Sequence, residues 1–267
     1  MRSTRIIAVA AVVVLIALVA SAVTLAATSS SPAQVAAASV AVGPGPPTTA
    51  TGTLVYSSTS GVTISADFAF DFEKDAADVT ATASLSIVTA TVEARLATDT
   101  FYLHVPQFAS LVGAPWVSTG ELGGPTRLDA LATAMRRPDL SRLDAKRRVT
   151  VRSAGGATTT LSFGLVHLPS TSGLPISLPS TARVTATVVT GDQGQLLSVA
   201  ALLVGRSRTD KLGFRVTGYN VPVDVTAPAP SDVVVLSGSR ERAIFGTNAP
   251  GIARALAGLR HLLRTGR

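Results

Sequence analysis

The strongest constraint on the fold is an eleven-residue stretch with strict alternation of side-chain type. Its apolar positions are Val62, Ile64, Ala66, Phe68, Phe70 and Phe72, and the small or polar residues between them are Thr63, Ser65, Asp67, Ala69 and Asp71. A period of two residues places successive side chains on opposite faces of a β-strand. We therefore predict an antiparallel strand with one apolar face and one solvated face, which also carries Asp67 and Asp71.

Similar alternation recurs along the chain. Further strands are predicted at residues 54–56, 79–85, 87–96, 101–105, 116–119, 148–153, 158–166, 183–190, 195–204 and 212–218. The segments 57–61 and 191–194 are rich in Gly, Ser and Asp and are typical of hairpin turns. The first five strands follow one another closely enough to form a meander.

One or two short helices are predicted beside the sheet. Thr126 is a candidate N-cap with Asp129 at the capping-box position, and the helix that follows carries Leu131 and Met135 on one side. The predicted fold class is mainly β (α+β): a large curved antiparallel sheet or half-barrel with one or two covering helices. An N-terminal transmembrane helix precedes it.

That N-terminal helix is predicted at residues 6–27, which are uncharged and follow Arg2 and Arg5. As a helix this segment is about 33 Å long, enough to cross a bilayer core. Two interpretations stay open: a signal peptide cleaved between Ala22 and Val23, or an uncleaved signal anchor, which the length favours. The domain is therefore expected on the extracytoplasmic side of the cell membrane, single-pass if anchored and secreted if cleaved.

Four segments are predicted: the anchor or signal at 1–27, a flexible linker at 28–51, a β domain at 52–235 and a basic tail at 236–267. The linker is rich in Pro, Ser, Thr and Ala and has little to bury. The tail contains an amphipathic helix with leucines on one side and arginines on the other. This helix either packs its leucines on the domain or lies on the membrane with its arginines toward anionic lipid.

The chain has few residues suited to covalent chemistry. It has no cysteine, and its three histidines, His104, His167 and His261, are isolated from one another. No sequence motif of a serine hydrolase, a zinc protease, a phosphate-binding loop or an EF-hand occurs. We therefore predict no enzymatic activity, no cofactor and no metal site.

The formal net charge is +7, and most of the basic residues are arginine. Aromatic residues make up only 4% of the chain, too few for a base-stacking surface, so no nucleic-acid partner is predicted. The densest basic cluster in the domain lies between residues 136 and 152. It is either an ordinary solvated surface or a site for anionic lipid headgroups, with Arg136 and Arg137 as the headgroup-binding candidates.

Four segments resemble a known family. Residues 101–106 (FYLHVP), 113–117 (GAPWV), 190–197 (TGDQGQLL) and 213–225 (GFRVTGYNVPVDV), the last followed by 227–233 (APAPSDV), are similar to segments of LppX/LprG-type (LprAFG-like) actinobacterial envelope lipid carriers, which have a LolA/LolB-like fold. The resemblance covers about residues 52–235. It implies a half-barrel sheet with an apolar cavity for the acyl chains of envelope lipids or lipoglycans. The chain departs from the family pattern in having no lipobox cysteine and no long helix before the first strand.

Two functions are compatible with these observations. The first is a membrane-tethered lipid- or lipoglycan-binding or transfer protein of a bacterial cell envelope. Its candidate lipid-binding residues are Phe68, Phe70, Phe72, Leu85, Leu103, Trp116, Leu131 and Met135. The second is a non-carrier envelope scaffold or interaction protein with a solid β core, which contacts an envelope protein partner.

Overall fold

The computed structural model describes residues 47–85, 88–106, 109, 112–121, 128–138, 140, 145–164 and 183–235. The predicted membrane helix at 6–27, most of the predicted linker and the predicted C-terminal helix lie outside these residues. Within the described part, no helix combines the length and the apolarity needed to cross a membrane.

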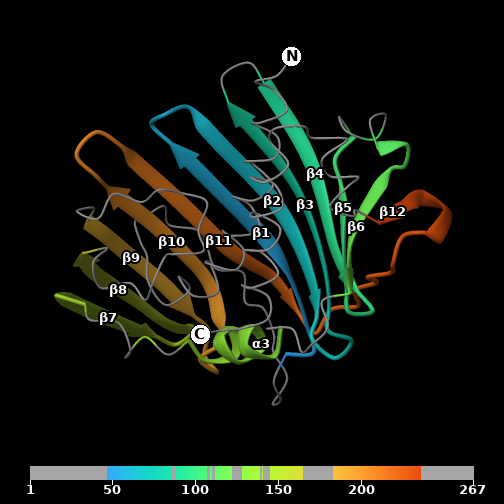
Figure 1. Cartoon of the computed structure of the whole chain (residues 1–267). Helices are drawn as coiled ribbons and strands as arrows, with labels where there is room; N and C mark the ends of the chain where they lie inside the picture. The colour runs from blue at the N-terminus through green and yellow to red at the C-terminus, as the bar shows by residue number, and fades with distance from the viewer. Residues whose placement is uncertain are drawn as a thin grey trace.

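The described strands form a single twelve-stranded sheet (Figure 1). The strands are β1 (Thr49–Ser58), β2 (Val62–Asp71), β3 (Ala76–Leu85), β4 (Val88–Ala97), β5 (Thr100–His104), β6 (Trp116–Glu121), β7 (Arg147–Ser153), β8 (Gly156–Gly164), β9 (Arg183–Thr190), β10 (Leu196–Val204), β11 (Thr209–Tyr219) and β12 (Val233–Val235). Their order across the sheet is β12-β6-β5-β4-β3-β2-β1-β11-β10-β9-β8-β7. The predicted mainly β class is confirmed.

The sheet consists of two antiparallel meanders that meet in its middle. Strands β1 to β6 run outward in one direction, and β7 to β11 return from the opposite edge to the centre. The two meanders are joined where β1 pairs with β11, for example through Leu54 opposite Phe214. The sheet is strongly twisted and stays open, with β12 at one edge and β7 at the other (Figure 1).

The prediction of a purely antiparallel sheet is wrong at one edge. Strand β12 pairs parallel to β6, with Val233 opposite Trp116, so the sheet is mixed. Three consecutive valines after a 3₁₀ turn at Pro230–Asp232 have no alternation that would mark a half-buried strand. Strand β1 also begins at Thr49, three residues before the predicted start of the β domain.

Alternation gives the sheet one apolar face, called the inner face below, and one polar outer face. In β2, Ile64, Ala66, Phe68 and Phe70 are buried, whereas Thr63, Ser65 and Asp67 are exposed, as predicted. The inner face continues through every strand from β1 to β5 and from β8 to β11. Its largest fully buried side chains include Leu54, Phe70, Leu161, Val184 and Val188.

The helix α3 (Leu128–Arg136) packs against β10 and is the only complete α-helix in the described part of the chain. Leu131 and Met135 are buried in the common core, as the predicted helical face requires. The hydroxyl of Tyr219 donates to the carbonyl oxygen of Leu196 at 2.6 Å, and the carbonyl oxygen of Met135 lies 3.4 Å away. Tyr219 therefore ties the end of α3 to β10 and β11.

Candidate functional site

An aromatic row crosses the middle of the inner face. The ring of Phe68 stacks on Phe70 and on Phe214, in both cases with 4.9 Å between ring centroids, and Phe70 lies 6.0 Å from Phe72. Phe68 belongs to β2 and Phe214 to β11, with β1 between them. All four rings are buried. The structure thus brings the three predicted phenylalanines together and adds Phe214, which the sequence did not single out.

A glycine in β1 makes this stacking possible. A Cβ atom at Gly52 would lie 2.3 Å from Cζ of Phe68 and 2.1 Å from the carbonyl oxygen of Arg215. Because Gly52 has no side chain, the Phe68 ring lies across β1 and reaches Phe214. The β1–β11 register shifts next to this position, between Thr51 and Gly52.

Of the other predicted lipid-binding residues, Leu103, Leu131 and Met135 join the core of the inner face. Leu103 is half-buried and lies opposite Ala94 in β4 and Val117 in β6. Leu85 ends β3 opposite Val88, and its side chain is outside the described part of the structure. The inner face therefore combines the aromatic row with aliphatic side chains from the sheet and α3.

Trp116 lies on the outer face, apart from the aromatic row. In the register it is opposite His104, and the guanidinium carbon of Arg95 lies 4.7 Å from the centre of its ring. The His104 ring is 5.3 Å away and is held by a 2.6 Å contact between its Nδ1 and the carbonyl oxygen of Pro115. Trp116 therefore lies on the opposite side of the sheet from the aromatic row.

Arg95 also neutralises acidic groups on the outer face. Its Nε lies 2.8 Å from Asp78 Oδ2, although the direction of the N–H does not give a hydrogen bond, and a second nitrogen is 3.9 Å from Glu93. Burial raises the pKa of Asp78, and the nearby positive charge of Arg95 offsets part of that rise. Near Trp116, the positive charge of Arg95 is therefore balanced by the carboxylates of Asp78 and Glu93.

Asp71 is buried rather than solvated, which corrects its predicted place on the wet face of β2. It ends the strand, and its Oδ1 accepts a 2.9 Å hydrogen bond from the backbone N–H of Lys74, while Oδ2 lies 3.2 Å from Lys74 Nζ. Burial alone would raise the pKa of Asp71. The hydrogen bonds and the charge of Lys74 outweigh that effect and lower the pKa. Asp71 therefore stabilises the β2–β3 turn.

A buried polar cluster lies at one end of the inner face. Arg208 Nε donates to Asp210 Oδ1 at 2.6 Å, the Tyr56 hydroxyl donates to the same oxygen at 3.1 Å, and the Arg208 guanidinium also donates to the Tyr56 hydroxyl. Burial raises the pKa of Tyr56. Burial would lower the pKa of Arg208, but its hydrogen bonds and its attraction to Asp210 and Tyr56 raise it. Sequence reasoning missed this cluster because Tyr56 is far from the other two residues along the chain.

The predicted headgroup candidates lie at the exposed end of α3. Arg136 is the last residue of the helix and Arg137 follows it, and both side chains are exposed. The Arg148 guanidinium donates to the carbonyl oxygen of Leu140, which connects the segment after α3 to β7. Arg148 and Arg152 are opposite Leu161 and Ala157 of β8 and so share the inner face at its edge.

Among the residues that the structure describes, no group of three or more His, Asp or Glu side chains is placed to hold a metal ion. The inner face, with its polar cluster and its arginine edge, is therefore the candidate site. Its middle is apolar and buried, and exposed arginines lie at its edge.

These features define an open, mainly β protein with one apolar sheet face and a short helix packed on it. No family model and no curated protein matches the chain. Among solved structures, the chain is similar to the Mycobacterium tuberculosis lipoprotein LppX, at 19% sequence identity and a TM-score of 0.36. The match covers 67% of this chain and 90% of LppX. It does not establish membership of the family that the sequence segments resemble.

Proposed function

We propose that this chain is an extracytoplasmic, membrane-tethered protein of a bacterial cell envelope that binds and transfers a lipid or lipoglycan. The observation that carries the proposal is the breadth of the inner face, which is apolar from β1 to β5 and from β8 to β11. An apolar sheet face must be covered by another layer. The inner-face side chains are buried, and among the described residues α3 is the only complete helix that packs on them. An acyl chain is a suitable second layer, because each buried CH₂ contributes about 0.8 kcal/mol.

In this proposal the acyl chain lies along the aromatic row, and the headgroup stays at the rim. Phe68, Phe70, Phe72, Leu103, Leu131 and Met135 contact the chain, together with Leu85 at the end of β3. Arg136 and Arg137 hold the headgroup. The phenylalanine rings are buried, so binding requires an opening of the core. The element suited to that movement is α3, which Tyr219 and a few apolar side chains hold on the sheet.

The second candidate is an envelope scaffold with a solid β core, which contacts a protein partner. This candidate is favoured by the burial of the inner-face side chains. Leu54 and Leu161 have no exposed surface, and Phe70 has only 2% of its surface exposed. In both candidates the chain performs no covalent chemistry, and no cofactor is needed.

Native mass spectrometry of the full chain, purified in detergent from an actinobacterial host, separates the two. We expect a co-purifying mass of one lipid or lipoglycan. Phe68→Leu removes one ring from the aromatic row and should lower lipid occupancy several-fold. Trp116→Leu on the outer face is the matched control and should leave lipid occupancy unchanged. Thermal melting of each variant checks that it is folded. Repeated purification without any bound lipid would exclude the carrier function.

A further inference from the structure

Charge is divided unequally between the two meanders of the sheet. Residues 49–121, which include β1 to β6, contain eight acidic and two basic residues. Residues 145–219, which include β7 to β11, contain nine basic and two acidic residues. The first meander therefore has a formal net charge of −6 (2 − 8) and the second a formal net charge of +7 (9 − 2).

The cations of the second meander gather at its free edge. We call Lys146, Arg147, Arg148, Arg152 and Arg183 the basic edge. Strands β7, β8 and β9 contain no acidic residue, and all seven residues of β7 are exposed. Within the described ranges, Arg148 is the only one of the five whose side chain donates a hydrogen bond, to the carbonyl oxygen of Leu140, and none of the five side chains forms an ion pair. Unpaired, exposed cations remain available to an external anion.

Apolar side chains are exposed beside these cations. Val149 and Val151 have 44% and 64% of their surface exposed and share the outer face of β7 with Arg147. Exposed apolar residues next to clustered arginines are typical of surfaces that lie on anionic lipid, where the cations attract the headgroups and the apolar groups enter the interface.

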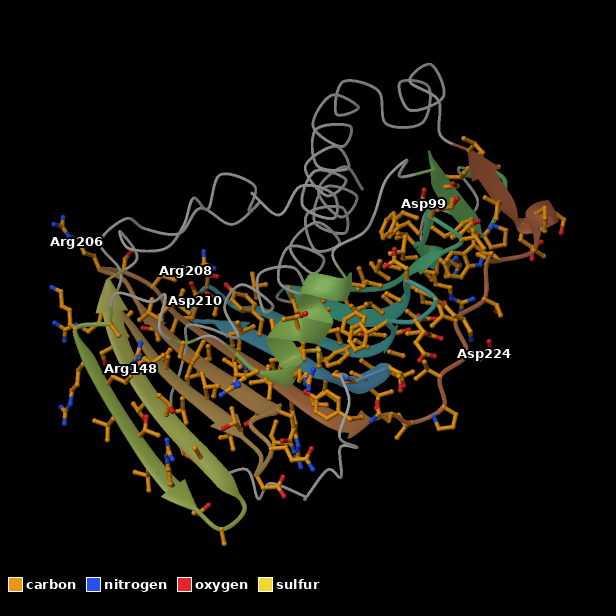
Figure 2. All side chains as sticks on the ribbon, turned by 90° about the horizontal axis from the view of Figure 1, so that it is seen from below. Asp99, Arg148, Arg206, Arg208, Asp210 and Asp224 are labelled. Carbon is orange, nitrogen blue, oxygen red and sulfur yellow. The ribbon has the colours of Figure 1, made fainter. Side chains whose placement is uncertain are left out.

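Charges on an edge strand also prevent it from pairing with other strands. That role accounts for the arginines of β7 but not for Arg183, which lies in the interior strand β9. Arg183 is opposite Val204, at the end of the sheet where β7 begins and next to the turn that carries the exposed Arg206. Figure 2 shows Arg148 and Arg206 on the same side of the molecule, opposite Asp99 and Asp224; Arg208 lies on that side too, but it is paired with Asp210. The positive surface therefore extends beyond the edge strand.

From these observations we infer that the basic edge is a docking surface for an anionic lipid bilayer, with Val149 and Val151 entering the headgroup region. The inference does not depend on lipid binding by the inner face. It fixes an orientation, because the acidic meander is repelled by the same bilayer. Each cation near an anionic surface should strengthen docking about fivefold, and salt near 1 M should abolish it by screening charges beyond about 3 Å.

The absence of cysteine allows a direct test with single labels on the full chain. Val151→Cys places an environment-sensitive fluorophore on the basic edge. Val55→Cys is the matched control, because Val55 is a 53% exposed outer-face valine in the acidic meander. The probes are vesicles of phosphatidylcholine alone or with about one third phosphatidylglycerol, each containing brominated quencher lipid. We expect quenching at position 151 only with phosphatidylglycerol and low salt, and none at position 55.

Reversing one charge tests whether the cations of the basic edge cause the vesicle response. In the Val151→Cys chain, Arg147→Glu should weaken the vesicle response about tenfold or more, since it removes one attraction and adds one repulsion. Lys211→Glu makes the same change on β11, about 19 Å from β7 across four strand spacings, and should have a much smaller effect. Equal effects of the two reversals, or quenching in neutral vesicles, would overturn the inference. A fluorescence shift that grows with protein concentration without vesicles would also overturn it and would assign the edge to a second copy of the chain.

Discussion

The two meanders are built alike but differ in what they carry. The first, β1 to β6, has phenylalanines on its inner face and balances its acidic groups locally, as Lys74 does for the buried Asp71 and Arg95 does for Asp78. The second has mainly aliphatic residues inside β8 to β10 and leaves its edge cations unpaired. Alternation of apolar residues determines the common architecture in both. The unpaired cations of the basic edge are exposed and lie outside the buried core, so their placement can serve function.

The largest expected effect tests the contrast between the two cores. Phe70→Ala removes a buried ring from the centre of the aromatic row and should lower the free energy of unfolding by about 3–5 kcal/mol. Leu161→Ala removes a fully buried side chain from β8, next to the edge strand β7, and should cost about 2 kcal/mol, because neighbours at the edge of the sheet can relax into the space. Urea unfolding of both variants measures the difference. A larger cost at Leu161 would mean that the aliphatic core is the more tightly packed.

The next effect concerns the pairing of β1 with β11, which joins the two meanders. Gly52→Ala places a methyl group within 2.3 Å of Phe68 and 2.1 Å of the Arg215 carbonyl oxygen, and should destabilise the fold by about 1–3 kcal/mol. Gly213→Ala on β11 is the matched control, since its nearest neighbour would be the Val55 carbonyl oxygen at 3.9 Å. Thermal melting should separate the two variants clearly. Equal melting temperatures would show that Phe68 can move off β1 without cost.

The strands could be predicted because their signal is local. Alternation within residues 62–72 identifies β2 and its faces, and the Gly-Asp-Gln-Gly segment identifies the β9–β10 hairpin, in which Gly191 N–H donates to the Gln195 carbonyl oxygen. Neither pattern indicates which distant strand pairs with a given strand in the sheet. The β1–β11 pairing, and with it the Phe68–Phe214 stack, therefore follows only from the three-dimensional structure.

The residues of the candidate site could likewise be predicted only where they share a local sequence pattern. The three phenylalanines of β2, Leu131 and Met135 share an apolar pattern and lie together in the core. Trp116 is also among the predicted lipid-binding residues, but strand register places it on the outer face. The Tyr56–Asp210–Arg208 cluster has no sequence motif at all, because it arises where the ends of two strands from different meanders come together.

A smaller effect is expected from two buried tyrosines, Tyr56 in β1 and Tyr219 at the other end of the β1–β11 pairing. Burial raises the pKa of both Tyr56 and Tyr219 in the folded state. The folded protein therefore holds these protons more strongly than the unfolded chain does. The stability that results is complete below the unfolded pKa of about 10 and is lost as the pH rises through the folded values.

Tyr219→Phe tests this pH dependence. It removes the hydrogen bond to the Leu196 carbonyl oxygen and should cost about 1 kcal/mol at neutral pH. It also removes one of the two groups that must ionise, so stability should fall less steeply above pH 10 than in the original chain. Denaturant unfolding at pH 8 and at pH 10.5 measures both effects. A slope unchanged by the substitution would mean that Tyr219 does not contribute to alkaline unfolding.

The smallest effect compares a paired cation of the first meander with an unpaired cation of the second. Lys74→Ala removes the ammonium group beside Asp71 but keeps the backbone N–H that donates a hydrogen bond to Asp71. Because the lysine side chain is 66% exposed, the free energy of unfolding should fall by no more than about 0.5 kcal/mol. Arg147→Ala should cost nothing, and at low salt it should stabilise slightly, because Arg147 lies between Lys146 and Arg148 and has no ion pair within the described residues. Urea unfolding at low and high salt measures whether each substitution raises or lowers the free energy of unfolding. If Arg147→Ala destabilises the protein as much as Lys74→Ala, the arginines of the basic edge stabilise the fold, and their availability for lipid is correspondingly reduced.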